Sequence, residues 1–215
     1  MSNEPSSKLL VSSLSIRPIR AVLITPGAGA SKDHQAVRAI DTAILDGCLG
    51  LATERIDFPY RIAGRKVPDK TPILIEAVAA AVDALAQRHG ISGEEIAVGG
   101  RSMGGRMCSL AVAEGMKVAA LFCVSYPLHP PGKPEKLRVD HFETVCIPTL
   151  FVSGTRDTFG KPDEFASHTP RVAGPFTQRW IEHGDHGLAR RGHDEMAGAM
   201  VATWINELNA RVPFP

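Results

Sequence analysis

The sequence lacks an excess of charge of either sign, because its 215 residues carry 24 Lys and Arg against 23 Asp and Glu. Proteins that bind nucleic acid or anionic membranes usually carry a basic excess. Apolar runs are also short, and none approaches the ~20 residues that a membrane-spanning helix needs. Residues 1–16 contain one Lys and a short apolar stretch broken by serines, unlike a secretory signal. We therefore expect a cytoplasmic protein whose partner is neither nucleic acid nor a membrane.

Cysteine is scarce. The four cysteines are Cys48, Cys108, Cys123 and Cys146, and no two of them form a C-x-x-C pair. This spacing excludes a zinc ribbon and a scaffold that depends on disulfides. Cys108, Cys123 and Cys146 have apolar sequence neighbours, so we expect reduced thiols in the hydrophobic core.

The common motifs that hold phosphates and catalytic metals are missing. There is no G-x-x-x-x-G-K-[ST], no G-x-G-x-x-G and no H-E-x-x-H. One segment is nevertheless rich in residue types that ligate metals: His183, Asp185, His186, His193 and Asp194. Because their spacing matches no metal-binding motif, we expect neither a metal nor a cofactor.

Strand-like and helix-like segments alternate along the chain, and a hydrophobic content of 44% is enough to build a core. The expected strands are 9–16, 20–25, 51–58, 95–100, 118–125, 145–153 and 176–182. The expected helices are 34–50, 69–90, 103–114 and 193–211. Pro148 lacks an N–H, which indicates that the first half of 145–153 is unpaired. The alternation predicts one α/β domain over 1–215, with 1–7 as a frayed tail, a mainly parallel sheet and helices on both faces.

The strongest motif is a G-x-S-x-G at Gly100–Gly104, between an expected strand and an expected helix. Ligands of parallel sheets bind beyond the carboxyl ends of strands, where this motif lies. A sharp turn there lifts the Ser102 hydroxyl clear of the sheet, and the glycines avoid collisions with neighbouring backbone. The alternative is a structural role without catalysis, in which the motif is a glycine-rich turn whose serine caps the helix. The strand–turn–helix context favours Ser102 as a nucleophile.

An acidic residue, Asp157, follows the expected strand 145–153. A carboxylate in that place can accept the N–H of a catalytic histidine and fix its tautomer. The alternative role of Asp157 is a turn or helix cap, which is common for Asp. Its rival Asp163 follows Pro162 and is expected to begin a helix.

A histidine loop follows the expected strand 176–182, and His186 within it can act as a general base. We prefer His186 over His183 and His193 because glycines on both sides leave room around it. A lone loop histidine would be read as a solvated surface group. The chain order Ser, Asp, His, each after its own strand, is the order of α/β-hydrolase triads.

A glycine-rich turn, Pro26–Ala30, follows the first buried strand. Such a turn can present a backbone N–H to a developing oxyanion, together with the N–H of Met103. Pro26 has no N–H, so Ala28 is the first choice as donor and Gly29 the reserve. The alternative is a flexible loop without a role in chemistry.

Several arginines lie in the segments that would surround this site: Arg61, Arg65, Arg101, Arg106 and Arg156. They can bind an anionic group of a substrate. More often such residues form ion pairs on the surface, and this second interpretation is the one we favour.

The chain resembles the α/β-hydrolase superfamily, and within it the group of testis-expressed protein 30 and a subunit of the non-specific lethal chromatin complex, relatives of the dienelactone hydrolases. The segments that carry the resemblance are PGAGA at 26–30, FPYR at 58–61, GRKVPDK at 64–70, GGRSMGGR at 99–106, YPLHPPGKPEKLR at 126–138, LFVSGTRDTFG at 150–160 and the His186 loop. Pro26 stands where the family pattern has a histidine, and Ser102 stands where dienelactone hydrolases have cysteine. The resemblance implies a three-layer α/β-hydrolase fold and catalysis without a cofactor.

The longest insertion, 126–144, is too short for a large lid domain, so we expect an open site rimmed by it and by 58–68. The predicted activity is cleavage of a carboxylic ester or thioester of a small soluble substrate through an acyl-enzyme on Ser102. A dehalogenase would need an acidic nucleophile instead. Because some relatives are complex subunits, the alternative is a catalytically idle interaction module, and a homo-oligomer or a protein partner stays open.

Overall fold

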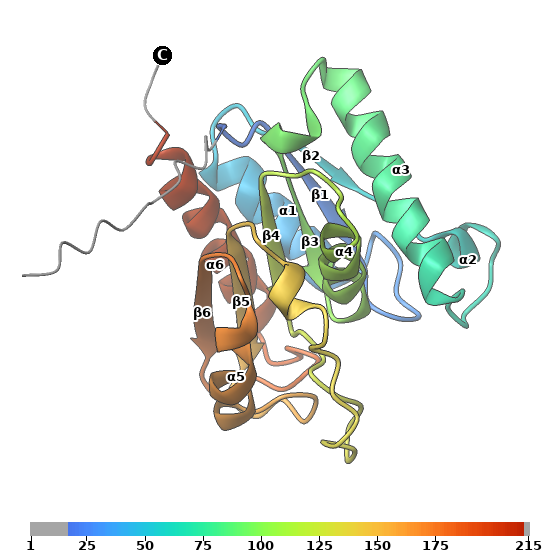
Figure 1. Cartoon of the computed structure of the whole chain (residues 1–215), viewed down its shortest axis with the longest axis vertical. Coiled ribbons are helices and arrows are strands. Elements are labelled where there is room, and N and C mark those ends of the chain that lie inside the picture. The colour runs from blue at the N-terminus through green and yellow to red at the C-terminus, as the bar shows by residue number, and fades with distance from the viewer. Residues whose placement is uncertain (1–16, 213–215) are drawn as a thin grey trace, which may run out of the picture.

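The core of the molecule is a six-stranded sheet in the order β2-β1-β3-β4-β5-β6 (Figure 1). The structure is a computed structural model and describes residues 17–212. The strands are β1 (Ala21–Thr25), β2 (Ala52–Arg55), β3 (Ile96–Arg101), β4 (Ala120–Val124), β5 (Thr149–Gly154) and β6 (Phe176–Ile181). Each neighbouring pair runs parallel, so all carboxyl ends lie at one edge of the sheet. The expected strand 9–16 lies outside the described residues.

Helices cover both faces of the sheet, as predicted. They are α1 (Gln35–Gly47), α2 (Pro59–Ile62), α3 (Thr71–His89), α4 (Met103–Ala113), α5 (Pro162–His168) and α6 (His193–Asn209). Figure 1 shows α3 and α4 on one face and α1 and α6 on the other. Their buried side chains form two separate apolar clusters with the two faces of the sheet. The result is the expected three-layer α/β architecture.

Local sequence explains where several elements begin and end. β1 is buried at every position, as expected for an apolar central strand of a parallel sheet. α3 has Pro72 in its first turn and ends at Gly90, whose φ of 61° is the left-handed conformation that glycine tolerates. β5 begins at Thr149, directly after Pro148, which confirms that 145–148 is not part of the ladder.

Two expectations differ from the structure. The strand predicted over 51–58 is only Ala52–Arg55, and helix α2 follows at Pro59, whose missing N–H suits a helix start and not a ladder. Cys146 was expected in the core, yet it is exposed, because it lies in the turn before β5 rather than in the strand. Cys108 and Cys123 are buried as predicted.

The connection from β4 to β5 spans 125–148 and projects beyond the carboxyl ends of the strands as the yellow loop in Figure 1. Its ends are held in an aromatic cluster, where the Tyr126 ring lies 5.5 Å from Phe142 and 5.7 Å from Phe151. The rest of the loop is short and carries no helix beyond the single 3-10 turn at Phe142–Thr144. The fold therefore has no large lid over the carboxyl edge.

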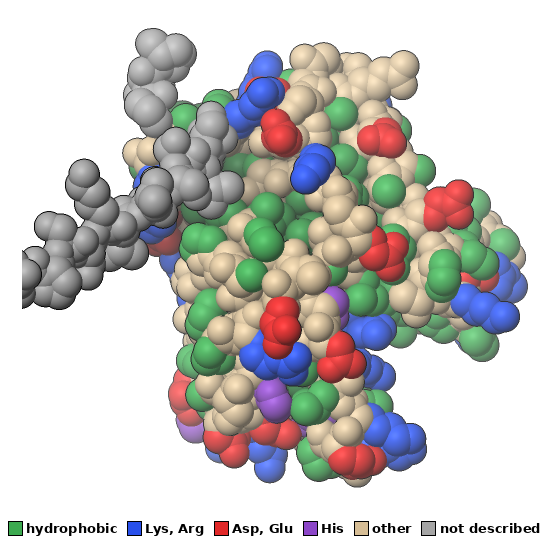
Figure 2. Space-filling model, in the orientation of Figure 1, with side chains coloured by type: hydrophobic (Ala, Val, Ile, Leu, Met, Phe, Trp, Pro, Cys, Tyr) green, Lys and Arg blue, Asp and Glu red, His purple; other side chains and the backbone are tan. Residues whose placement is uncertain are grey.

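The surface in Figure 2 carries acidic and basic side chains side by side, with apolar groups between them. This distribution agrees with the balanced charge of the sequence. Among the described residues, no helix is both long and apolar enough to cross a bilayer.

Candidate active site

Ser102 lies on the turn between β3 and α4 in an uncommon backbone conformation, with φ 51° and ψ −116°. Its N–H donates to the Val124 carbonyl at 2.8 Å, which fixes the turn against β4. The turn is crowded, since a Cβ on Gly104 would come within 2.6 Å of the Pro26 carbonyl oxygen. Strained backbone of this kind persists only where surrounding structure enforces it, and it clusters at functional sites.

Asp157 lies in the turn after β5 and is completely buried. Its carboxylate accepts the Phe159 N–H at 2.8 Å, and this bond holds one oxygen in place. The same carboxylate lies 2.9 and 3.0 Å from Nδ1 of His186. A buried carboxylate in contact with an imidazole N–H fixes the histidine tautomer that leaves Nε2 as an acceptor.

His186 lies on the loop after β6, and its Nε2 is 2.9 Å from Oγ of Ser102. The imidazole stacks on the Phe159 ring, with centroids 3.8 Å apart and planes inclined by 21°. The structure thus brings together Ser102, Asp157 and His186 in one chain of hydrogen bonds. The three residues follow three different strands, β3, β5 and β6, so the site forms only when these strands lie in one sheet.

The rival residues lie elsewhere. Asp163 is in the first turn of α5, as its place after Pro162 predicted. The imidazole of His183 lies 3.2 Å from Glu182, and His193 begins α6. Within residues 17–212, none of these three side chains forms a hydrogen bond to Ser102 or His186.

The turn at 26–30 lies beside the Ser102 turn, because a Cβ on Gly27 would be 3.6 Å from Cβ of Ser102. The reserve oxyanion donor, Gly29, already donates its N–H to the Tyr60 hydroxyl at 3.0 Å. In the described part of the chain, the N–H groups of Ala28 and Met103 donate to no other protein group. Both N–H groups are therefore free to bind another acceptor.

Arg101, the residue between Gly100 and Ser102, contributes to the site in a way that sequence reasoning missed. Its guanidinium donates to the His186 carbonyl at 2.7 Å, which ties the histidine loop to the serine turn. Burial lowers the Arg101 pKa, while the charges of Asp194 and Asp157 act in the opposite direction. Burial also disfavours the charged form of Asp194 and therefore raises the pKa of its carboxyl group. The position of Arg101 next to the nucleophile was a visible signal, but its partner is 85 residues away.

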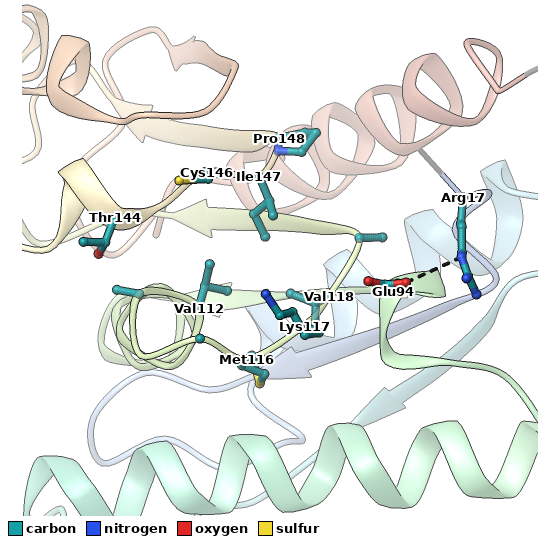
Figure 3. Close-up of a pocket in the computed structure, with 13 residues that line it drawn as sticks. Arg17, Glu94, Val112, Met116, Lys117, Val118, Thr144, Cys146, Ile147 and Pro148 are labelled. Carbon is teal, nitrogen blue, oxygen red and sulfur yellow. Dashed lines mark ion pairs between the residues drawn. The ribbon is translucent and has the colours of Figure 1, made fainter. Parts of the chain in front are cut away.

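A hollow of about 380 Å³ lies at the opposite edge of the sheet (Figure 3). It is lined by residues before β4 and β5 and by the end of α4. The ion pair of Arg17 and Glu94, with Nε and Oε2 3.5 Å apart, lines it too. The exposed Cys146 lines it as well. Because parallel strands place their amino ends there, this hollow is separated from Ser102 by the length of the sheet.

Metal-ligating side chains do not gather at the site. Among the residues that the structure describes, no group of three or more His, Cys, Asp or Glu is arranged to hold a metal ion.

Solved structures with the same fold are numerous, at low sequence identity. Est1E from Butyrivibrio proteoclasticus is 17% identical, with 90% of each chain covered and a TM-score of 0.70. A dienelactone hydrolase from Anabaena variabilis is 18% identical, covering 88% of this chain and 87% of that one, with a TM-score of 0.71. An alpha-beta serine hydrolase homologue from Coxiella burnetii is 18% identical, covering 92% and 89%, with a TM-score of 0.63. A family model described as an alpha/beta hydrolase domain matches residues 18–211, and the chain belongs to that family.

Proposed function

We propose that this chain is a single-domain serine hydrolase that cleaves a carboxylic ester or thioester of a small substrate. One observation carries the proposal, namely the hydrogen-bonded series from Ser102 through His186 to the buried Asp157. A nucleophile in contact with a base that is itself oriented by a third group is the arrangement that covalent acyl transfer requires.

The reaction has two halves. Ser102 Oγ attacks the carbonyl carbon while its proton passes to Nε2 of His186, and the carbonyl oxygen becomes an oxyanion. The N–H groups of Ala28 and Met103 stabilise that charge, since fixed donors at a developing oxyanion need no reorganisation. The tetrahedral intermediate then collapses, the alcohol or thiol leaves with the proton from His186, and an acyl-enzyme remains on Ser102.

Water completes the cycle. His186 takes a proton from the water as it attacks the acyl-enzyme, and returns that proton to Oγ of Ser102 when the acid is released. Asp157 keeps Nδ1–H of His186 pointing away from the serine throughout, and it stabilises the imidazolium that forms in each half.

The comparisons support an ester as the substrate class. The names of the similar structures include a dienelactone hydrolase and the esterase domain of a Rhodothermus marinus protein, and Est1E was solved with ferulic acid bound. The more specific likeness to the testis-expressed protein 30 group belongs to this proposal too. A cytoplasmic location is also part of it, because all four cysteines are free and such thiols persist in reducing compartments.

A fluorophosphonate probe tests the proposal directly, because it adds covalently to an activated serine. We expect labelling of the wild type at Ser102, and complete loss of labelling and of aryl-ester hydrolysis in Ser102→Ala. Ser167→Ala, which removes an exposed hydroxyl on α5, is the matched control and should keep both. Folded wild-type protein that is not labelled, or is labelled at another serine, would contradict the proposal and favour an interaction module.

A further inference from the structure

Arg106 lies one helical turn after the serine. Its N–H donates to the Ser102 carbonyl at 3.1 Å, as the first regular bond of α4. At ~1.5 Å rise per residue, the two Cα atoms are separated by about 6 Å along the helix axis. The Arg106 side chain is half-buried, and its Nε is fully covered and has no acceptor.

Arg138 approaches the same place from the connection between β4 and β5. Its N–H donates to the Leu128 carbonyl at 2.8 Å, and its carbonyl accepts from the buried Tyr126 hydroxyl at 2.7 Å. His129, which follows Leu128 in the chain, donates its N–H to the carbonyl of Phe159, and the Phe159 ring stacks on His186. Arg138 is thus anchored on backbone that adjoins the histidine side of the site.

Neither guanidinium has a partner. Within residues 17–212, Arg106 and Arg138 form no side-chain hydrogen bond and no ion pair within 4.0 Å. Other arginines of the chain do have carboxylate partners: Arg17, Arg20, Arg55, Arg65, Arg88, Arg171 and Arg179. Arg106 and Arg138, like exposed arginines such as Arg38 and Arg156, therefore lack the carboxylate that these seven arginines of the described chain have.

The local electrostatics disfavour two cations without an anion. The charge of Arg106 acts, after burial, to lower the pKa of Arg138. The adjacent His141, hydrogen-bonded to Ser109 at 2.9 Å, has its pKa lowered to about 4 by burial and by Arg106, against the smaller opposing effect of the Asp140 carboxylate. The imidazole is therefore neutral and does not add to the charge. A half-buried pair of like charges is stabilised when an anion binds between them.

We propose that Arg106 and Arg138 form a subsite for an anionic group, a carboxylate or a phosphate, on the substrate that Ser102 cleaves. The inference rests on the proposed function and makes it more specific, because it assigns an anionic ester as the substrate class. Guanidinium groups suit this role, since their planar donors bind such oxyanions in a bidentate manner. The fixed distance between the subsite and the serine would select the length of the spacer between anion and ester.

Matched esters test the subsite. The first pair is a monoaryl adipate and the aryl hexanoate, which place a carboxylate or a methyl group on the acyl chain. The second pair is the butyrate ester of 4-hydroxybenzoate and that of 4-hydroxytoluene, which place the same difference on the leaving alcohol. We expect the anionic member of one pair to be preferred in kcat/KM by about 10- to 100-fold, the range of charged hydrogen bonds. The pair that shows the preference identifies which side of the ester binds Arg106 and Arg138.

Substitutions then assign the preference. Arg106→Gln and Arg138→Gln should each reduce the ratio of anionic to neutral kcat/KM at least tenfold, mainly through KM. Arg88→Gln, which removes an arginine already paired with Glu54, is the matched control and should leave the ratio unchanged. Arg106→Lys and Arg138→Lys keep the charge and serve where a glutamine variant does not fold. An unchanged ratio in folded Gln or Lys variants, or equal rates for both members of both pairs, would overturn the subsite while leaving serine hydrolysis intact.

A binding measurement separates the two proposals. Calorimetric titration of the Ser102→Ala protein with adipate and with inorganic phosphate needs no hydrolysis. Binding that is lost in the Ser102→Ala, Arg106→Gln double variant supports the subsite even if no ester is cleaved. Absence of binding of either anion, together with equal rates on the esters, would refute it.

Discussion

The two ends of the parallel strands, called here the carboxyl edge and the amino edge of the sheet, differ in backbone strain as much as in side chains. At the carboxyl edge, four non-glycine residues of the described chain have positive φ: Ser102, Ser125, His183 and Leu188. Each of them follows the end of β3, β4 or β6. The amino edge holds the hollow of Figure 3, lined mainly by apolar side chains, and none of these strained residues.

This difference shows which signals identify a reactive site in such a fold. A hollow needs only imperfect packing, and the one at the amino edge contains no histidine. Strained turns and a buried carboxylate bonded to a histidine need surrounding structure that enforces them. The carboxyl edge is therefore where perturbation should affect activity, and the amino edge is where it should not.

The largest expected effect is at Asp157. Asp157→Asn keeps the size of the side chain but presents an amide to His186, which favours the wrong tautomer and removes the charge that stabilises the imidazolium. We expect kcat to fall by a factor on the order of 10⁴ with an unchanged circular dichroism spectrum. Asp163→Asn, on exposed α5, is the control. If Asp163→Asn were the more damaging change, the acid would be misassigned.

The next effect is at Arg101, which ties the His186 loop to the serine turn. Arg101→Met removes the donor to the His186 carbonyl, and a displacement of the imidazole by ~1 Å should lower kcat by about 10- to 100-fold. KM should change little, because Arg101 acts through His186. Arg156→Met, an exposed arginine after β5, is the matched control. Equal losses of kcat in the two variants would show that Arg101 has no special positioning role.

A smaller effect concerns the segment that joins the two edges. His141 has a pKa of about 4 in the fold against an ordinary value of 6.5, because it is half-buried and near Arg106. The unfolded chain then binds a proton that the folded chain does not, so stability falls as pH decreases from about 6.5 towards 4. His141→Gln should flatten this decline by something on the order of 1 kcal/mol, measured by urea unfolding at several pH values. An identical decline in the variant would mean that other groups cause it.

The smallest effect is at the amino edge. Cys146 is exposed there, so iodoacetamide should modify it first. Cys108 and Cys123 should resist, because burial raises the pKa of Cys108 to about 12 and that of Cys123 well above its ordinary value. Modified protein should retain kcat/KM within about twofold, since Cys146 is remote from Ser102. A large loss of activity on modification would show that the two edges are coupled, and Cys146→Ser would identify the thiol responsible.

The sequence predicts the local features of this molecule well. The G-x-S-x-G turn, the start of α5 at Pro162 and the exclusion of Pro148 from β5 depend on a few neighbouring residues, and each is found where expected. Most strands are shorter than their apolar runs, and β2 is half as long as expected, because hydropathy marks burial and not ladder hydrogen bonds.

Individual contacts between distant residues could not be predicted, although the order of the strands indicated that Ser102, Asp157 and His186 lie at one end of the sheet. The Gly29 N–H donates a hydrogen bond to the hydroxyl of Tyr60, which lies 31 residues later in the chain. Cys146 is exposed because it precedes β5 instead of lying in the strand, although its sequence neighbours are apolar. The hydrogen bond from Arg101 to the His186 carbonyl and the stacking of Phe159 on the imidazole likewise depend on tertiary packing.

The order in which the chain supplies the site has a consequence for refolding. Ser102 and His186 are separated by 84 residues, and β6, which carries the His186 loop, is the last strand to join the sheet in sequence and lies at its edge. Contacts between residues so far apart require closure of long loops, which makes them slow to form. A nascent or refolding chain can therefore hold most of its helices and central strands before any base reaches the serine. Ser102 can therefore contact its general base only once β6 has joined the sheet and carried the His186 loop to it.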